Sequence, residues 1–501
     1  MNPRLILVLT LLVASNAFAA KPPNIVYILA DDLGYAELSC YGQKKFKTPH
    51  IDQLAKEGMR FMQHYTGQAV CAPARCVLMT GKHTGHSYIR NNGNPKFPKS
   101  EWEKHGWLFP GQNPIPDGEV TIAELLKQKG YATAAIGKWG LGHVGTSGDP
   151  NKQGFDLFFG MNCQVHAHSY YPGHLWHNNK KFKLNNVPPV PGHASLPKGA
   201  DPNDPKSYER FKGKDHATDH MIKFALDFIR ENKEGPFFLY YPSPIPHVAL
   251  HVYDEELKPF AGKWPETPFT GGGYTPHQTP KAAYAAMIAR LDREVGQIMA
   301  ELKEQGLDDN TIVIFSSDNG TTHLKKEVDY DFFESVGPLR GLKGSLYEGG
   351  IRVPMIARWP GRIKAGTQSD HISAFWDVMP TLADISGTKA PKNIDGISFA
   401  PTLFGRGNEQ KKHEYLYWEF RAYGGQQAVR LGDWKGVRQN LMRRKKGADP
   451  MKIQLYNLAN DIGESKDVAA DNPKIAARIR QIMKDGRTPS KLFAFPLLDQ
   501  Q

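Results

Sequence analysis

Uninterrupted apolar runs recur along the chain and alternate with segments in which apolar residues follow helical spacing. A continuous apolar run is typical of a strand that is buried on both faces of a parallel sheet. Between the runs, Thr121-Ile122-Ala123-Glu124 forms a capping box, and Gly130 stands where that helix should end. Longer amphipathic helices are expected over residues 219–232 and 281–305. The expected strands cover residues 24–30, 132–136, 237–241, 311–316 and 353–357.

Strands that alternate with helices predict an α/β fold, in which helices cover both faces of a mostly parallel sheet. Residues 141–216 are rich in Gly, Pro, Asn, His and Lys, so we expect a long loop that shapes a pocket at the mouth of the sheet. Beyond residue 366, short strand-like runs and a helix near residues 473–484 predict a smaller α+β domain. The predicted boundaries are 21–365 for the α/β domain and 366–501 for the C-terminal domain.

Residues 1–20 have the pattern of a secretory signal peptide. Arg4 supplies the positive charge, residues 5–13 are apolar, and Ala17-Phe18-Ala19 matches a cleavage site. A membrane anchor is less favoured, because the apolar stretch is shorter than the roughly 20 residues that a spanning helix needs. We therefore expect an exported protein, periplasmic or secreted, that is not embedded in a membrane.

The chain of 501 residues has a formal net charge of +12 at pH 7. For an exported protein, this charge favours a polyanionic substrate or surface, and we expect no nucleic acid as a partner. For a single basic run such as residues 443–446, a solvated surface is the alternative. The four cysteines, Cys40, Cys71, Cys76 and Cys163, are too few for a disulfide scaffold. If Cys71 serves chemistry, at most one disulfide forms among the other three.

Polar side chains follow several of the expected strands. Asp31-Asp32 come after the first, Lys138 after the second, His247 beyond the third and Asp318-Asn319 after the fourth. In an open α/β sheet the ligand site lies outside the carboxyl ends of the strands, so we expect these residues to converge. The aspartates and the asparagine offer oxygen ligands, which suit Ca²⁺ or Mg²⁺ rather than zinc. A single Asp-Asp pair is more often a surface turn, but two clusters at strand ends favour a cation site.

The run Cys71-Ala72-Pro73-Ala74-Arg75, followed by Thr80-Gly81, adds a candidate nucleophile. For Cys71 by itself, an ordinary buried thiol is the alternative. Together with the residues after the strands, this run resembles the signature of the formylglycine-dependent sulfatases, an arylsulfatase-like family of the alkaline phosphatase superfamily. Further motifs of that family occur in the same order: Asn24-Ile25-Val26, Asp31-Asp32-Leu33-Gly34, Gly137-Lys138-Trp139, Pro246-His247, Ser317-Asp318-Asn319-Gly320, Lys343 and Glu348-Gly349-Gly350-Ile351-Arg352-Val353-Pro354.

The resemblance implies an alkaline-phosphatase-like fold and the hydrolysis of sulfate esters. It implies that a formylglycine-generating enzyme oxidises Cys71 to formylglycine, whose hydrate is the nucleophile. It also implies a cation, Ca²⁺ with Mg²⁺ as the alternative, held by Asp31, Asp32, Asp318, Asn319 and the oxygen at residue 71. The other implied catalytic residues are Arg75 and Lys138, which orient the nucleophile, and His247 and Lys343, which bind the sulfate and help protonate the departing oxygen.

The chain departs from the family pattern at two positions. Ala74 stands where the fuller signature usually has Ser, and Gly140 stands where many members have a His that removes the proton during sulfate expulsion. His143, His166 and His168 are candidates for that base. On a strand, His166 and His168 would share one face. They could then contact sulfate or sugar, hold a transition metal, or be structural.

The substrate favoured by these features is a sulfated carbohydrate rather than a small aryl sulfate. Tyr170, Tyr171 and Trp176 could stack on sugar rings, and Arg340, Arg352 or the basic tail could contact further sulfates. Similarity to the carbohydrate sulfatase branch suggests an exo-acting enzyme on a galactose-type sugar. Two alternatives remain: a phosphonate monoester or phosphodiester hydrolase of the same superfamily, and a non-catalytic binder of sulfated glycans.

Overall fold

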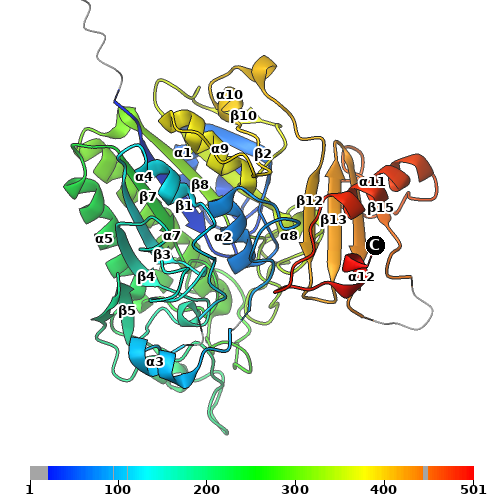
Figure 1. The fold of residues 1–501 in the computed structure, drawn as a ribbon. Helices are drawn as coiled ribbons and strands as arrows, with labels where there is room; N and C mark the ends of the chain where they lie inside the picture. Colours follow the sequence, from blue (N-terminus) through cyan, green and yellow to red (C-terminus); the bar gives the residue numbers. More distant parts are fainter. Residues whose placement is uncertain (1–20, 94, 110, 444–448, 501) are drawn as a thin grey trace, which may run out of the picture.

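The computed structural model describes residues 21–93, 95–109, 111–443 and 449–500. The predicted signal peptide, residues 1–20, lies outside the described residues. A large α/β part holds one sheet, and the C-terminal part holds a second, antiparallel sheet at its side (Figure 1). No helix of the described residues is long and apolar enough to cross a membrane.

The large sheet has the strand order β10-β2-β9-β8-β1-β7-β3-β4-β5-β6, and β11 also pairs with β2. Strands β8, β1, β7, β3 and β4 run parallel, whereas β9 is antiparallel to both of its neighbours. The bounds are β1 Asn24–Ala30, β2 Met59–Tyr65, β3 Ala132–Lys138, β4 Leu157–Met161, β5 His174–His177, β6 Lys180–Lys183, β7 Phe237–Pro242, β8 Thr311–Ser317, β9 Arg352–Arg358, β10 Thr367–Ser369 and β11 Ser373–Ala374.

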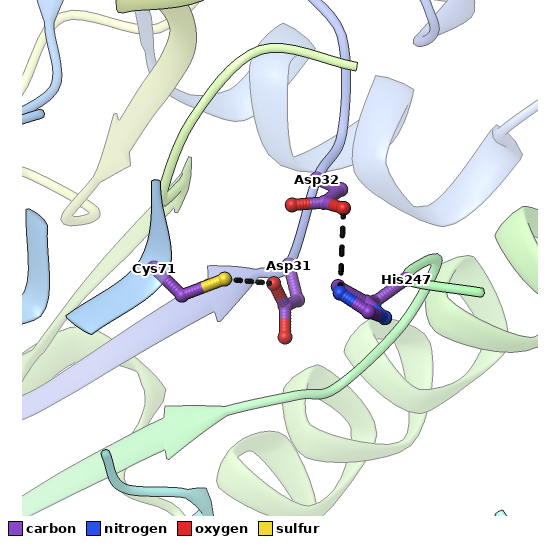
Figure 2. A group of neighbouring side chains, drawn as sticks. All are labelled: Asp31, Asp32, Cys71 and His247. Carbon is purple, nitrogen blue, oxygen red and sulfur yellow. Dashed lines mark hydrogen bonds and ion pairs between the residues drawn. The ribbon is translucent and has the colours of Figure 1, made fainter. Parts of the chain in front are cut away.

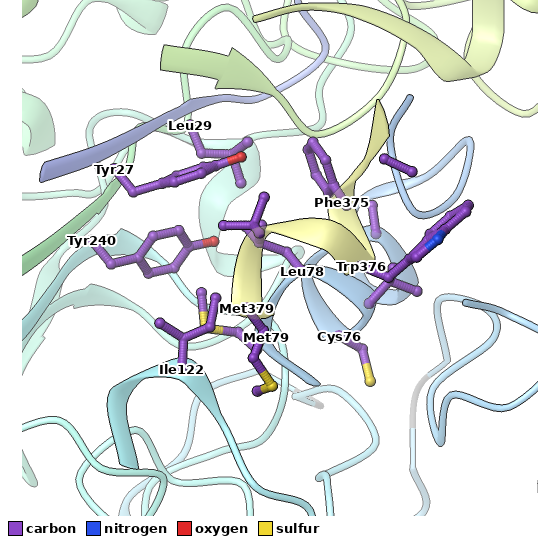
Figure 3. Close-up of a cluster of buried hydrophobic side chains, with 14 of the residues drawn as sticks. Tyr27, Leu29, Cys76, Leu78, Met79, Ile122, Tyr240, Phe375, Trp376 and Met379 are labelled. Atoms are coloured by element: carbon purple, nitrogen blue, oxygen red, sulfur yellow. The ribbon is translucent and has the colours of Figure 1, made fainter. Parts of the chain in front are cut away.

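Helices cover both faces of this sheet, as the sequence predicted. On one face lie α1 (Pro49–Glu57), α5 (Ala217–Glu231) and α7 (Pro280–Glu304), and on the other lie α2 (Cys71–Thr80), α4 (Ile122–Lys127) and α9 (Val378–Ser386). Strand β1 contributes alternate side chains to the two cores, which explains its continuous apolar run. Figure 3 shows the core on the face that α2, α4 and α9 cover, where Leu78 of α2 and Met379 of α9 pack near Tyr27 and Tyr240 of the sheet.

The C-terminal part is a four-stranded antiparallel sheet with α11 (Pro473–Asp485) packed on its outer face. Its strands are β12 Leu416–Phe420, β13 Gln426–Leu431, β14 Trp434–Gln439 and β15 Gln454–Asn457. The remaining helices are short: α3 Lys99–His105, α6 Asp254–Leu257, α8 Glu348–Ile351, α10 Ala400–Leu403 and α12 Pro496–Asp499. The 3-10 helices are η1 Ser39–Tyr41, η2 His166–His168, η3 Pro205–Phe211, η4 Asp308–Asn310, η5 Phe375–Asp377 and η6 Gly407–Glu409.

The strand pairing corrects two expectations drawn from the sequence. Residues 141–216 are not one long loop, because β4 continues the parallel sheet beside β3 and β5 and β6 extend it as antiparallel strands. The large sheet also extends past residue 365, since β10 and β11 pair with β2 and α9 packs against α2. The second sheet begins only at Leu416.

Candidate active site and metal centre

The two acidic clusters meet at the carboxyl ends of neighbouring strands. Strands β1 and β8 pair in parallel register with Ala30 opposite Ser317, so the residues that follow them lie side by side. The Asp32 amide donates to Asp318 Oδ1 at 3.1 Å, and Asn319 Nδ2 donates to Asp32 Oδ1 at 2.7 Å. Asp32 has a φ of 66°, a left-handed conformation that non-glycine residues adopt at an energetic cost, often at functional sites.

Cys71 is the first residue of α2 and points at the strand ends (Figure 2). Its thiol donates to Asp31 Oδ1 at 3.3 Å. The ammonium groups of Lys138 and Lys343 donate to its sulfur at 3.4 and 3.7 Å. The residue is only 1% exposed, so the sulfur sits in a closed setting of one carboxylate and two cations.

Arg75 lies one helical turn beyond Cys71 and joins the two strand ends. Its Nε and Nη2 both donate to Asp318 Oδ2, at 3.1 and 2.9 Å. Its Nη2 also lies 3.6 Å from Asp31 Oδ2, and its Nη1 donates to the carbonyl of Lys138. Arg75 is fully buried, so it fixes α2 against β1, β3 and β8 through charge-assisted hydrogen bonds.

The remaining predicted residues complete the same cluster. Lys138 Nζ pairs with Asp31 Oδ2, and Lys343 Nζ donates to Asp32 Oδ2 at 2.7 Å. His247 Nε2 lies 3.7 Å from Asp32 Oδ2, while its Nδ1 donates to the Val248 carbonyl. Three cationic side chains therefore contact three carboxylates without any bound ion. The cations are Arg75, Lys138 and Lys343, and the carboxylates are Asp31, Asp32 and Asp318.

Burial and these charges set the protonation states. Burial would raise the pKa of Asp31, but Lys138, His247 and Arg75 hold it well below its usual range. Burial, and next the neighbouring Asp31, raise the pKa of Asp318 to about 7. Burial, and next the charge of Asp31, also raise the pKa of the Cys71 thiol to about 12. The sulfur is therefore a neutral thiol rather than a reactive thiolate.

The oxygen donors of the cluster fit a hard divalent cation. Ligand atoms of Asp31, Asp32, Cys71 and His247 all lie within 4.8 Å of one another. Asn319 Oδ1 is buried and has no hydrogen-bond partner in the described structure, although a buried carbonyl oxygen normally has one. Asp318 lies outside this compact group, and its oxygens accept from Arg75 and the Asp32 amide. The unpartnered Asn319 oxygen beside two carboxylates is the feature that a Ca²⁺ or Mg²⁺ ion would satisfy.

A pocket of about 300 Å³ opens over Cys71. Five of the residues that line it were predicted as site residues from the sequence: Asp32, Cys71, His168, His247 and Lys343. It did not single out the amides and rings that also line it: Asn91, Asn92, Gln112, Gln164, Tyr274, His323 and Tyr423. These residues stand on loops with no motif of their own, and only the fold brings them to the strand ends.

His168 reaches the pocket with a defined tautomer. His193 Nδ1 lies 3.0 Å from the Gly273 carbonyl, which can only accept, so His193 Nε2 is an acceptor. His168 Nδ1 lies 2.7 Å from that nitrogen and must carry the proton. The lone pair of His168 Nε2 therefore faces the pocket, where it accepts from the Tyr274 hydroxyl at 3.4 Å, and the ring stacks on His247 at 5.3 Å between centroids.

The expectation that His166 and His168 share one face of a strand is wrong. They lie in the 3-10 helix η2, in which residues two apart point in different directions. His166 is buried, stacks on Phe109 and contacts the His174 carbonyl through Nε2 at 2.9 Å. His143 is buried between aromatic rings, away from the pocket lining. Of the three candidate histidines, the structure brings only His168 to Cys71.

Other predicted substrate contacts also lie elsewhere. Tyr170, Tyr171 and Trp176 are buried in the core, which contradicts their expected stacking on sugars. Arg340 is not in the pocket lining; its Nη1 donates to the Glu464 carbonyl at 2.6 Å, and its guanidinium lies over Tyr347. Arg352 is buried and pairs with Glu348. The structure does not bring these arginines to the pocket.

Gly140 lies directly against the Gln164 side chain. A Cβ atom at residue 140 would lie 2.4 Å from Gln164 Nε2, and the φ of +89° disfavours a side chain there. Both amide atoms of Gln164 are buried without a partner in the described structure. Gln164 therefore fills the space in front of residue 140, so no histidine fits there unless Gln164 moves.

The comparisons with known proteins agree with this geometry. The family model for sulfatases matches residues 23–388, and a model for the C-terminal part of N-sulphoglucosamine sulphohydrolase matches residues 342–488. The chain belongs to the sulfatase family. Human arylsulfatase A is 31% identical over 95% of this chain and 89% of its own. N-acetylgalactosamine-6-sulfatase of Rattus norvegicus is 32% identical over 77% of this chain and 67% of its own.

A solved structure extends the likeness to the whole fold. The crystal structure of Ps i-CgsB in complex with k-i-k-neocarrahexaose superimposes with a TM-score of 0.72 and 27% identity, and covers 93% of each chain. The fold is thus the alkaline-phosphatase-like α/β fold of sulfatases, with a separate C-terminal antiparallel sheet. As a member of this family, the protein is a sulfuric ester hydrolase.

Proposed function

We propose that the protein is an exported carbohydrate sulfatase that uses a formylglycine made from Cys71 and a divalent cation. The observation that carries the proposal is the position of Cys71, whose sulfur lies between Asp31 and the ammonium groups of Lys138 and Lys343 at the strand ends. A neutral thiol in a binder of glycans would not need this setting. The clustered cations suit a substrate that brings a sulfate to residue 71.

The cation is proposed to be Ca²⁺, with Mg²⁺ as the alternative. Asp31, Asp32, Asp318, Asn319 and the oxygen at residue 71 would hold it, and His247 lies close enough to join them. The ion would neutralise the sulfate and polarise its oxygens. The oxygen ligands and the unpartnered Asn319 carbonyl support this choice over zinc.

Formylglycine, the oxidised form of Cys71, would supply a hydrated aldehyde as the nucleophile. The maturation enzyme that makes it needs access to the Cys71 side chain, which is 1% exposed in the fold. Oxidation is therefore expected before folding is complete. Arg75 and Lys138 would then hold residue 71 in place through the contacts that they already make.

Two residues of the pocket are proposed to move protons. Burial would lower the pKa of Lys343, but Asp32 raises it well above its usual value, so its Nζ holds a proton for the leaving oxygen. His168 Nε2, whose lone pair faces the pocket, would accept the proton that a histidine at position 140 accepts in related enzymes. Burial lowers the pKa of His247 well below its usual value, so His247 would bind sulfate as a neutral ring.

A sulfated sugar is the proposed substrate, and a galactose-type residue at a chain end is its narrower form. The pocket volume of about 300 Å³ is at the lower end of ligand sites, which supports one sugar at a time. Its amide side chains offer both donors and acceptors to hydroxyl groups. Relatives whose names refer to N-acetylgalactosamine-6-sulfate and neocarrahexaose support the same class.

The test is release of free sulfate from defined sulfated oligosaccharides, with matched phosphodiesters as the comparison. The protein is co-produced with a formylglycine-generating enzyme, and conversion of Cys71 is checked by peptide mass. Release from a sulfated sugar, with much slower turnover of the phosphodiester, supports the proposal. Faster turnover of the phosphodiester, or binding without any release from fully converted protein, would refute it.

Export is proposed from residues 1–20, and the compartment is periplasmic or extracellular. The N-terminal sequence of the protein recovered from its native host decides this. A mature chain that begins near residue 21 supports export. An intact Met1 in the cytosol contradicts it.

A further inference from the structure

Arg438, in the C-terminal part, is a buried arginine without a carboxylate partner. It lies on β14 and is 1% exposed. Gly436, two residues earlier and so on the same face of the strand, faces Ile479 of α11. Arg438 Nη1 donates to Gln427 Oε1 at 2.9 Å, but its buried Nε has no partner among the described residues.

Three other buried arginines of this protein do pair with carboxylates. Arg75 lies 2.9 Å from Asp318, Arg90 lies 2.7 Å from Glu419, and Arg290 lies 2.9 Å from Glu256. Arg438 is in no ion pair within the part of the chain that the structure describes. Burial, and next the like charge of Arg480, lower its pKa to about 10. An uncompensated buried charge destabilises a fold unless something pairs with it.

Arg438 lines a cavity of about 740 Å³ between α11 and the chain around β15. Lys452, Arg480 and Lys484 line it too, and Asp449 is the one carboxylate among the described lining residues. Arg480 and Lys484 are four residues apart on α11, so their side chains lie on the same face of the helix. The volume lies within the range of ligand sites, and cations dominate its wall.

We propose that this cavity binds an oxyanion, the sulfate or carboxylate group of an acidic glycan, with Arg438 at its base. A guanidinium with free N–H groups matches the oxygens of such a group, and the anion would supply the missing partner. Helix α11, which lines the cavity, lies on the side of the C-terminal sheet that faces away from the large domain (Figure 1). The assignment of the ligand as a glycan rests on the proposed function, whereas the oxyanion site rests on the geometry of Arg438 alone.

The first test compares thermal unfolding in sodium sulfate and in sodium chloride of equal ionic strength. The proteins are the wild type, Arg438→Met and, as a control for the loss of one positive charge, Arg478→Gln, which lies on α11 outside the cavity. We expect the stability of Arg438→Met in chloride to be close to that of the wild type, because the change removes an unpaired buried charge but leaves Gln427 Oε1 without its donor. Sulfate should raise the melting temperature of the wild type and the control more than that of Arg438→Met.

Sulfate bound in the catalytic pocket contributes equally to all three proteins and cancels in this comparison. An equal sulfate effect in all three would overturn the proposal.

The second test measures binding of size-defined dextran sulfate, with unsulfated dextran as the blank. We expect Arg438→Met to bind dextran sulfate about tenfold more weakly, the effect of losing a hydrogen bond to a charged group, while Arg478→Gln binds like the wild type. Equal affinities would refute a glycan site. Turnover of a small sulfate ester should be the same in all three proteins, so absent turnover would count against the proposed function and leave the anion result standing.

Discussion

Among single residues, His168 shows how a neighbour can fix the chemistry of a side chain. The Gly273 carbonyl sets the tautomer of a neutral His193, and His193 sets that of His168, so the unprotonated Nε2 of His168 faces the pocket over Cys71. His193 contacts no predicted catalytic residue except through His168 and Tyr274. It is therefore a positioning residue, and its effect should appear in the rate of the reaction rather than in binding.

We predict that His168→Ala lowers kcat by about 10²–10⁴, the usual contribution of a general base, with a small change in KM. His193→Phe, which cannot accept from His168 Nδ1, should lower kcat by about fivefold to tenfold, the cost of one hydrogen bond. His193→Gln keeps an acceptor and a donor and should restore most of the rate. Steady-state kinetics on one sulfated sugar would measure these rates, and equal kcat values for His193→Phe and His193→Gln would contradict this account.

The cation site depends on individual oxygen ligands. Removal of divalent ions by a chelator should stop turnover, and Ca²⁺ should restore it more fully than Zn²⁺, because the ligands are oxygens. Asn319→Ala removes the unpartnered Oδ1 and should raise the Ca²⁺ concentration for half-maximal rate by about tenfold or more. Activity that is indifferent to chelation would contradict the site, as would an Asn319→Ala variant with unchanged Ca²⁺ dependence.

Among the elements, the strands were predictable and the loops were not. The expected strands over residues 24–30, 237–241 and 311–316 correspond to β1, β7 and β8, because burial on both faces leaves a continuous apolar run. The residues that follow these strands could be placed at one edge of the sheet, because the carboxyl ends of parallel strands lie together. Gln164 and Tyr274 could not, since no periodicity marks a loop residue that the fold carries to the pocket. The prediction for residues 166–168 was wrong because two histidines spaced two residues apart do not distinguish a strand from a 3-10 helix.

The capping box at the start of α4 was predicted and is confirmed. The Thr121 side chain accepts from the Glu124 amide at 3.2 Å, and the Glu124 carboxylate accepts from the Thr121 amide at 2.8 Å. We predict that Thr121→Ala destabilises the fold by about 1 kcal/mol, the usual effect of losing a cap, and that Thr121→Ser costs less. Denaturant unfolding of the three proteins measures this, and equal midpoints for Ala and Ser would contradict it.

For the whole molecule, a buried charge cluster joins the two sheets. Lys435 of β14 pairs with Glu348 at 2.8 Å and with Glu464 at 3.1 Å, and all three side chains are inaccessible to solvent. Glu348 belongs to α8, directly before β9 of the large sheet, and its other oxygen accepts from Tyr65. The C-terminal part is thus fixed to the domain that holds Cys71 by interactions that exclude water.

Lys435→Met should destabilise the protein by about 3–5 kcal/mol, because it leaves two buried carboxylates without their shared cation. The double variant Lys435→Met with Glu464→Gln removes one of those charges and should recover part of the loss. Thermal and denaturant unfolding measure both proteins. A single variant as stable as the wild type would show that the cluster does not hold the two parts together.

The measurement that tests the central claim most directly relates turnover to the chemical state of residue 71. Preparations with different fractions of formylglycine, quantified by peptide mass, are assayed for free sulfate from one sulfated sugar, with Cys71→Ala as the blank. The account predicts that the rate rises in proportion to the converted fraction and is absent in Cys71→Ala. A rate that does not depend on conversion, or that survives in Cys71→Ala, would contradict it.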